Sequence, residues 1–173
     1  MSSPVTLSRQ VAKQAQRGAG GRHTVGMASR SLWGQTPRES IEHECGRRGS
    51  AAVVAGCVEL LGHGEADDAL IIALGGPAAR SVLDSGPAPV HQYWLRVWAA
   101  RALLYAWDDR ASGAVLAALA DESWRVREMA AKVVARHRLG AALSAVAGLR
   151  NDPVPRVRAA AARATAVLTA NRA

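Results

Sequence analysis

Phenylalanine is absent from the 173 residues, and aromatic residues make up only 4% of the chain. A core built around many large rings is therefore excluded, whereas the abundance of alanine favours helices that pack closely together. The two cysteines, Cys45 and Cys57, are too few for the disulfide framework of a small secreted domain. No apolar run approaches the roughly 18 residues of a membrane span, so the sequence predicts no membrane partner.

Acidic residues are missing from residues 1–38, which carry six basic side chains. This stretch is rich in serine, glycine and glutamine, so it cannot bury enough apolar surface to offset its chain entropy. We therefore expect residues 1–38 to form a disordered basic tail. The N-terminus also lacks the continuous apolar segment of a secretory signal, and the expected location is the cytoplasm. Two alternatives stay open, namely an organelle transit peptide and translation from Met27.

The net charge of +8 is unevenly distributed along the chain. The tail contributes +6; residues 39–120 have six basic and ten acidic side chains, giving −4; residues 121–173 have ten basic and four acidic, giving +6. A basic tail and a basic C-terminal part favour an acidic partner, such as nucleic acid or an anionic surface.

Only helical patterns occur after the tail. Apolar periodicity and flanking glycine and proline predict helices at residues 50–62, 65–76, 77–86, 92–107 and 112–120. Gly62 is expected to end the first of these helices, and Pro77 to open the third. No alternating strand pattern is present, so the predicted fold class is all-α.

The C-terminal part of the sequence repeats itself. The stretch "WRVREMAAKVVARHRLG" at residues 124–140 returns at residues 155–169 as "PRVRAAAARATAVLT". When Asp121 is aligned with Asp152, the two copies match without a gap, and their apolar positions recur on one helix face. We call the distance along the chain from Asp121 to Asp152 the repeat interval.

A helical hairpin of this kind cannot bury its apolar face alone but can do so against a neighbouring copy. The clearest repeats are expected at residues 92–120, 121–151 and 152–173. The first of them is aligned through its Arg-Val dipeptide, which places Arg96 opposite Arg125. In this alignment Trp98 stands where Arg127 and Arg158 stand in the later copies.

The stretches "DPVPRVRAAAARA" and "DESWRVREMAAKVVA" resemble HEAT-like repeats, in the short form first associated with phycobilisome lyases. The resemblance covers roughly residues 92–173 and extends more loosely back to about residue 50. In detail the chain is similar to small actinobacterial HEAT-repeat proteins of unassigned function. The resemblance implies a short HEAT-like α-solenoid, an armadillo-like α–α superhelix, over residues 39–173. It implies no particular activity.

In the HEAT-like family the aspartate of the turn and the arginine that follows it are structural. Carried over to this chain, the resemblance implies that Asp121 and Asp152 accept backbone N–H groups. It also implies that Arg127 and Arg158 reach a carboxylate of a neighbouring repeat. Contact of these arginines with a ligand is the alternative.

Five of the seven aromatic residues lie at residues 93–107. A helix that is apolar nearly all round is typical of a core, and the alternative is a groove whose rings hold bases or a partner's side chains. The basic residues of the last repeats form either a solvated exterior or a phosphate-binding ridge, and not all of them can share one helix face. The candidate binding surface comprises Trp94, Trp98, Arg101, Tyr105, Arg125, Lys132, Arg156 and Arg163.

No catalytic or metal-binding pattern is present. The stretch "HEC" at residues 43–45, taken with Cys57 and His63, matches no zinc-site spacing. The stretch "WDDR" at residues 107–110 is where an aspartate of a DNA-repair glycosylase would be sought, but aspartate is also common in turns and caps. The sequence therefore predicts neither an enzyme nor a bound cofactor or metal.

The function predicted from the sequence is that of a non-catalytic adaptor that presents a helical-repeat surface to a protein partner. The alternative is a nucleic-acid-binding protein that uses the basic tail and the basic C-terminal repeats. Convergence of the arginines on one face would favour the alternative. Self-association through the repeat ends is a further expectation.

Overall fold

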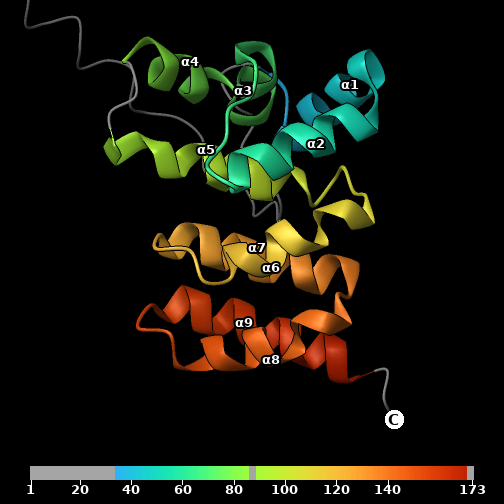
Figure 1. Ribbon diagram of the computed structural model, residues 1–173, viewed down its shortest axis with the longest axis vertical. Coiled ribbons are helices and arrows are strands. Elements are labelled where there is room, and N and C mark those ends of the chain that lie inside the picture. The colour runs from blue at the N-terminus through green and yellow to red at the C-terminus, as the bar shows by residue number, and fades with distance from the viewer. Residues whose placement is uncertain (1–33, 86–88, 171–173) are drawn as a thin grey trace, which may run out of the picture.

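The computed structural model describes residues 34–85 and 89–170 (Figure 1). All regular secondary structure in these two ranges is helical, which confirms the predicted all-α class. Most of the predicted tail, residues 1–33, lies outside the described residues. Among the described helices, none combines the length and the apolar character that crossing a bilayer requires.

The described ranges contain nine α-helices and three short 3₁₀ helices. The α-helices are α1 Pro37–Arg48, α2 Ser50–Leu61, α3 Asp68–Gly75, α4 Pro77–Asp84, α5 Pro89–Ala102, α6 Ser112–Ala118, α7 Trp124–His137, α8 Leu143–Gly148 and α9 Pro155–Thr169. The 3₁₀ helices are η2 Asp109–Ala111, η3 Gly140–Ala142 and η4 Leu149–Asn151.

Helix α1 begins before the expected end of the tail. Its start is fixed by a capping box, in which the Thr36 hydroxyl accepts from the Glu39 backbone N–H at 3.2 Å and the Glu39 carboxylate accepts from the Thr36 N–H at 2.7 Å. Pro37 occupies the first helical position, where no N–H is needed. The sequence carries this capping-box signal at residues 36–39, so the composition of the tail alone was a poor guide to its end.

The helices before α5 follow local signals in the sequence. Gly62 is the residue at which α2 ends, as expected. Asp67 caps α3 by accepting from the Leu70 N–H at 3.0 Å, so this helix starts later than residue 65. Pro77 opens α4, and the turn before it needs the positive φ of Gly76.

Helix α5 ends at Ala102, although the sequence pattern predicted a helix to residue 107. The reason lies in a contact with α7. His137 Nε2 donates to the Leu103 carbonyl at 2.7 Å, and its ring stacks on Trp107 with centroids 4.1 Å apart. The Leu103 carbonyl therefore bonds to a side chain from another helix, and the chain leaves the helical path before Trp107.

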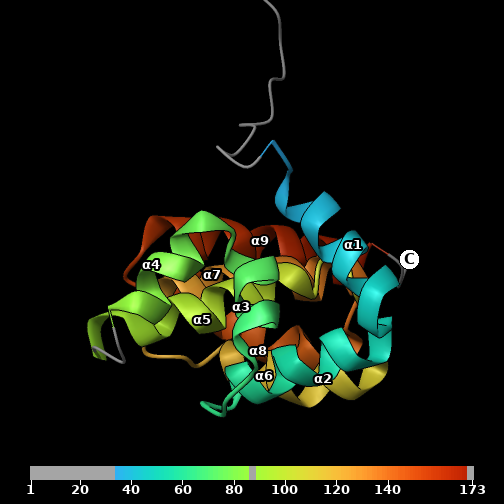
Figure 2. The ribbon, with the colours of Figure 1, turned by 90° about the horizontal axis from the view of Figure 1, so that it is seen from above.

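The helices form two rows that run down the molecule (Figures 1 and 2). Helices α5, α7 and α9 pack on one another in one row, and α2, α6 and α8 lie on the other side. The remaining helices, α1, α3 and α4, lie at the end nearest to α5. Fully buried aliphatic side chains lie between the rows, among them Val115 of α6, Val133 of α7 and Val146 of α8.

The two C-terminal hairpins, α6–α7 and α8–α9, are related throughout by the repeat interval. The 3₁₀ helices η2 and η3 start at Asp109 and Gly140, and the next α-helices start at Ser112 and Leu143. The starts of α7 and α9 are separated by the same interval. A constant interval means that equivalent side chains lie on equivalent faces of neighbouring helices.

Candidate binding face

Two buried ion pairs join successive helices of the α5–α7–α9 row. Arg96 of α5 donates through Nε and Nη2 to Asp121, at 2.7 and 3.2 Å. Arg127 of α7 donates in the same way to Asp152, at 2.7 and 3.2 Å. In both pairs the aspartate follows the arginine by 25 residues, and its carboxylate is almost fully buried. We call this repeated contact the arginine ladder.

The arginine ladder corrects the alignment of the first repeat. The Arg-Val dipeptide placed Arg96 opposite Arg125 and put Trp98 in the place of Arg127. The ion pairs instead make Arg96 the equivalent of Arg127, because each reaches the aspartate 25 residues later. These two arginines are then separated by the repeat interval, as are the equivalent residues of the two C-terminal hairpins, and Trp94 corresponds to Arg125.

The ladder aspartates also hold the turns in which they lie. Asp121 accepts from the Ser123 N–H at 2.7 Å, and Asp152 accepts from the Val154 N–H at 2.8 Å. Each carboxylate therefore fixes the start of the next helix as well as the arginine of the preceding one.

Arg158 of α9 occupies the ladder position of the last repeat, but it makes only the contacts with backbone carbonyls and not the ion pair. Its Nη1 donates to the carbonyls of Asp152 and Pro153 at 2.8 and 3.0 Å, as Arg127 Nη1 donates to the carbonyls of Asp121 and Glu122. Within residues 34–85 and 89–170 no carboxylate forms an ion pair with Arg158. The predicted contact with a neighbouring carboxylate is thus seen for Arg127 and not for Arg158.

The arginine ladder makes the stability of the fold sensitive to acid. The guanidinium of Arg127, together with the Val154 N–H, lowers the pKa of Asp152 from its ordinary value of 3.8, against the opposing effect of burial. A carboxyl whose pKa is lower in the folded state stabilises the fold above the unfolded pKa, and this contribution is lost as the pH falls through the folded pKa. Asp152→Asn is therefore expected to reduce the loss of unfolding free energy that occurs as the pH falls below about 4.

Urea unfolding followed by circular dichroism at several pH values tests this expectation. Asp84→Asn is the control, because Asp84 is exposed at the end of α4. The same pH dependence for wild type and Asp152→Asn would contradict it.

The candidate residues of the sequence analysis form two columns on the α5–α7–α9 row. One column contains Trp94, Arg125 and Arg156, and the other contains Arg101, Lys132 and Arg163; successive members of each are separated by the repeat interval. Within a helix the two columns are seven residues apart, so at about 100° per residue they share one side. Arg136 lies on this side of α7 too, eleven residues after Arg125. We call the side of the row that carries these columns the α5–α7–α9 face.

Arginine side chains and aromatic rings lie against one another along this face. Trp98 stacks on Trp94 with centroids 6.2 Å apart. The Arg125 Cζ atom lies 5.3 Å from the Trp94 centroid and 4.4 Å from that of Trp124, and the Arg156 Cζ atom lies 5.6 Å from Trp124. The arginine–aromatic stack therefore runs in the order Trp98, Trp94, Arg125, Trp124 and Arg156, with Tyr93 beside Trp94 and Arg125.

Arg125 is fixed by rings and not by a carboxylate. Three ring centroids lie within 5.7 Å of its Cζ atom, and no ion pair reaches it among the described residues. A guanidinium that stacks through its faces leaves its N–H edges available for a planar anion. Such a position is suited to bidentate contact with a carboxylate or phosphate.

Glu128 lies between the two basic columns. It is buried, and its carboxylate contacts Lys132 Nζ at 2.9 Å and Arg156 Nη2 at 3.4 Å. Burial by itself raises the pKa of Glu128, but the hydrogen bond and charge of Lys132 and the proximity of Arg156 outweigh this, so the pKa lies below 4.5. Glu128 therefore stays ionised and neutralises part of the basic face.

Three candidate residues do not lie on the accessible part of the face. Trp98 is 5% exposed, because the end of α3 packs closely over its ring at Gly75. Arg101 is largely covered, which lowers its pKa, and its Nη2 donates to the Leu74 carbonyl of α3 at 2.6 Å. Tyr105 lies beyond the end of α5 and is 42% exposed.

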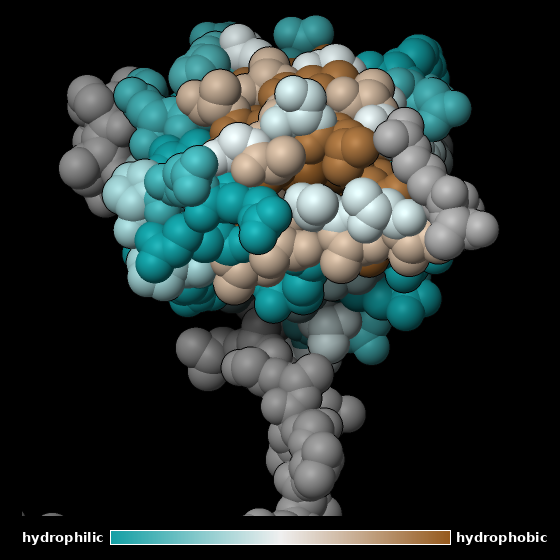
Figure 3. Space-filling model, turned by 90° about the horizontal axis from the view of Figure 1, so that it is seen from below, coloured by the Kyte–Doolittle hydropathy of each residue, from teal (hydrophilic) through white to brown (hydrophobic). Residues whose placement is uncertain are grey.

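The end of the molecule formed by α8 and α9 differs from the inner repeats. Arg150 and Thr165 occupy the positions at which the preceding repeat has the buried Leu119 and Val134. This end shows an apolar patch surrounded by hydrophilic side chains (Figure 3). Polar residues on the outer side of a terminal repeat are typical of a cap. Self-association through this end stays a prediction.

Other polar clusters of the described residues are engaged in structure. Asp108 accepts from the Arg110 N–H at 2.9 Å and caps η2, and Asp109 accepts from Trp107 Nε1 at 3.1 Å. No group of three or more histidine, cysteine or carboxylate side chains in these ranges has the arrangement of a metal site.

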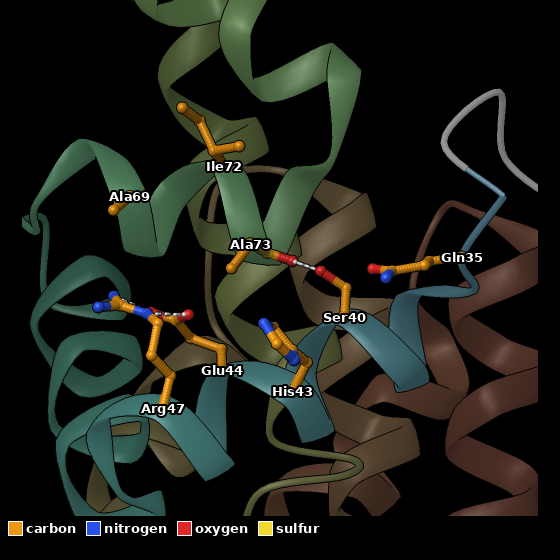
Figure 4. Close-up of a pocket in the computed structure, with 8 residues that line it drawn as sticks. All are labelled: Gln35, Ser40, His43, Glu44, Arg47, Ala69, Ile72 and Ala73. Carbon is orange, nitrogen blue, oxygen red and sulfur yellow. Dashed lines mark hydrogen bonds and ion pairs between the residues drawn. The ribbon is translucent and has the colours of Figure 1, made fainter.

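A pocket lies between α1 and α3 (Figure 4). The Ser40 hydroxyl there donates to the Ala73 carbonyl at 2.8 Å, and Arg47 donates to the Glu44 carboxylate at 2.7 and 2.9 Å. Arg48 pairs with the same carboxylate. The pocket thus presents its one carboxylate already bound by two arginines, and it carries less ligand-binding chemistry than the α5–α7–α9 face.

Comparison of the chain with protein-family models, with curated proteins and with solved structures gives no match.

Proposed function

We propose that this chain is a non-catalytic, HEAT-like helical-repeat protein, a short α-solenoid, that binds a protein partner through its α5–α7–α9 face. The constant repeat interval, the two rows of helices and the arginine ladder support the solenoid, since each repeat covers the face of the one before it.

Arg125 carries the proposal for the binding face. Its guanidinium is held by Tyr93, Trp94 and Trp124 without a carboxylate of its own. Tryptophan, tyrosine and arginine are the residue types that contribute most binding energy at protein interfaces. The acidic group nearest to the stack, Glu128, is bound by Lys132 and Arg156, which suits a structural role better than proton transfer.

Nucleic-acid binding is the second candidate function. It is favoured by the alignment of Arg125, Lys132 and Arg136 on one side of α7, with Arg156 and Arg163 at equivalent positions on α9. The acid-free residues 1–38 add six basic side chains.

Site-specific photocrosslinking of the full chain in cell extract tests the proposed function. A photoreactive residue at Arg163 lies on the face, and one at the exposed Ala55 of α2 is the control. We expect distinct protease-sensitive adducts from position 163 that are absent from position 55. Nuclease-sensitive adducts would favour the second candidate, and equal adducts from both positions would contradict a binding role for the face.

A further inference from the structure

Arg125 differs from the two ladder arginines in its partners. Arg96 and Arg127 bind carboxylates of the chain itself, at 2.7 Å for the closest atoms. Arg125 lies against three rings and has no ion pair with a carboxylate among the described residues. These ring contacts restrict the Arg125 side chain, so part of the entropy that an arginine loses on binding is lost before any ligand arrives.

Arg125 and Arg156 both lie close to the ring of the same residue, Trp124. Their Cζ atoms are 4.4 and 5.6 Å from its ring centroid, so they are at most about 10 Å apart, the sum of the two distances. An extended peptide advances about 3.3 Å per residue, so side chains two or three residues apart are separated by about 7–10 Å. Two carboxylates on one extended segment can therefore reach both guanidinium groups, which lie at most about 10 Å apart.

The charge pattern of the face suits a short acidic segment better than a continuous polyanion. Glu128 lies between Lys132 and Arg156, so a phosphate chain that followed the basic side chains would pass a buried, ionised carboxylate. A protein segment can place a neutral residue at that point.

The aromatic rings of the face also fit a protein better than single-stranded nucleic acid. Bases need exposed rings on which to stack. Among the large hydrophobic residues in the described ranges only Tyr105, which lies beyond α5, is exposed, whereas Arg125 covers Trp94 and Trp124.

We infer that the partner of the α5–α7–α9 face is a protein with an extended acidic segment, which places one carboxylate on Arg125 and a second on Arg156. This inference rests on the proposed function and adds the chemistry of the partner to it. The segment crosses from α7 to α9 over Trp124, and the two arginines bind it through N–H groups, those of Arg156 in addition to its 3.4 Å contact with Glu128.

Fluorescence anisotropy with the full chain tests the inference. The probe is a labelled peptide of about twelve residues, which is long enough to cross helices about 9 Å apart, with glutamate alternating with serine. The matched peptide has glutamine in place of glutamate, and a DNA single strand of similar length serves as the nucleic-acid probe.

We expect the acidic peptide to bind more tightly than the glutamine peptide and than the DNA. Arg125→Ala is expected to weaken its binding by about tenfold or more, because a charged hydrogen-bonded pair is lost. Arg125→Lys keeps the charge without the planar fork and should lose most of the same affinity. Arg80→Ala, which removes the same charge from the exposed side of α4, is expected to change binding by less than about twofold.

Three results would overturn the inference. The first is equal binding of the acidic and glutamine peptides, and the second is an equal effect of Arg80→Ala and Arg125→Ala. The third is tighter, Arg125-dependent binding of DNA. If the crosslinks from position 163 persist in any of these cases, the face still binds a partner, and only the inferred acidic segment of that partner is wrong. If the crosslinks from position 163 are absent as well, both the inference and the proposed function fail.

Discussion

Arg127→Ala is expected to lower the free energy of unfolding by about 3–5 kcal/mol. The substitution leaves the Asp152 carboxylate, which is 4% exposed, without its guanidinium partner. It also removes the donor to the Asp121 and Glu122 carbonyls. Urea unfolding at neutral pH, followed by circular dichroism, measures the loss.

Arg158→Ala is the matched control, since Arg158 holds the same position one repeat later. It donates to two carbonyls in the same way but forms no ion pair in the described part of the chain. Its replacement is expected to cost about 1 kcal/mol or less. Equal losses for Arg127→Ala and Arg158→Ala would show that the buried ion pair is not what joins the repeats.

Gly75→Ala is expected to destabilise the fold by about 1–3 kcal/mol through overpacking. A Cβ atom at this position would lie 2.6 and 2.7 Å from two ring atoms of Trp98, and 2.7 Å from the Ala79 Cβ. The Trp98 ring is rigid and 5% exposed, so the α3–α4 turn must move away from α5. Thermal unfolding measures the effect.

Gly113→Ala is the control for Gly75→Ala, because the same substitution is expected to have the opposite effect on stability at this position. Gly113 lies in α6, and a Cβ atom there would meet nothing within 4 Å. Alanine in place of glycine within a helix is expected to stabilise the fold by about 0.5–1 kcal/mol. If both variants are equally stable, α3 does not pack on Trp98 as described.

The sequence carried enough information for the two C-terminal repeats but led to a wrong register for the first. Letter matching paired Arg96 with Arg125 because valine follows both. The physical constraint is the distance along the chain from the ladder arginine to its aspartate, which is 25 residues for Arg96 and Asp121 and again for Arg127 and Asp152. A search for that pair of residues at a constant spacing would have found the register.

The burial of Trp98 agrees with the core interpretation of its apolar helix, but the element that covers it was not predictable from local patterns. Trp98 and Arg101 were both candidates for the binding surface, yet α3 contacts both. The end of α5 likewise depends on His137, which lies 34 residues after the carbonyl that it binds. Contacts of this kind join segments far apart in the chain, and helical periodicity carries no signal for them.

The separation of structural and free arginines is visible in one short segment. Arg125 and Arg127 are two residues apart in α7, so at about 100° per residue they point to nearly opposite sides. Arg127 meets Asp152 and Arg125 meets aromatic rings. Periodicity shows that the two arginines point to different sides of α7. Only the packing of α9 and α5 against these sides shows which arginine pairs with a carboxylate.

The free energy of unfolding of Arg125→Ala, measured beside that of Arg127→Ala, tests most directly whether Arg127 is a structural residue and Arg125 is free for a partner. The account predicts a loss of about 1 kcal/mol for Arg125→Ala, because only ring contacts are removed, and a loss about three times as large or more for Arg127→Ala. An equal loss for the two variants would contradict the account, since Arg125 would then be a structural residue and not the free group of a binding face.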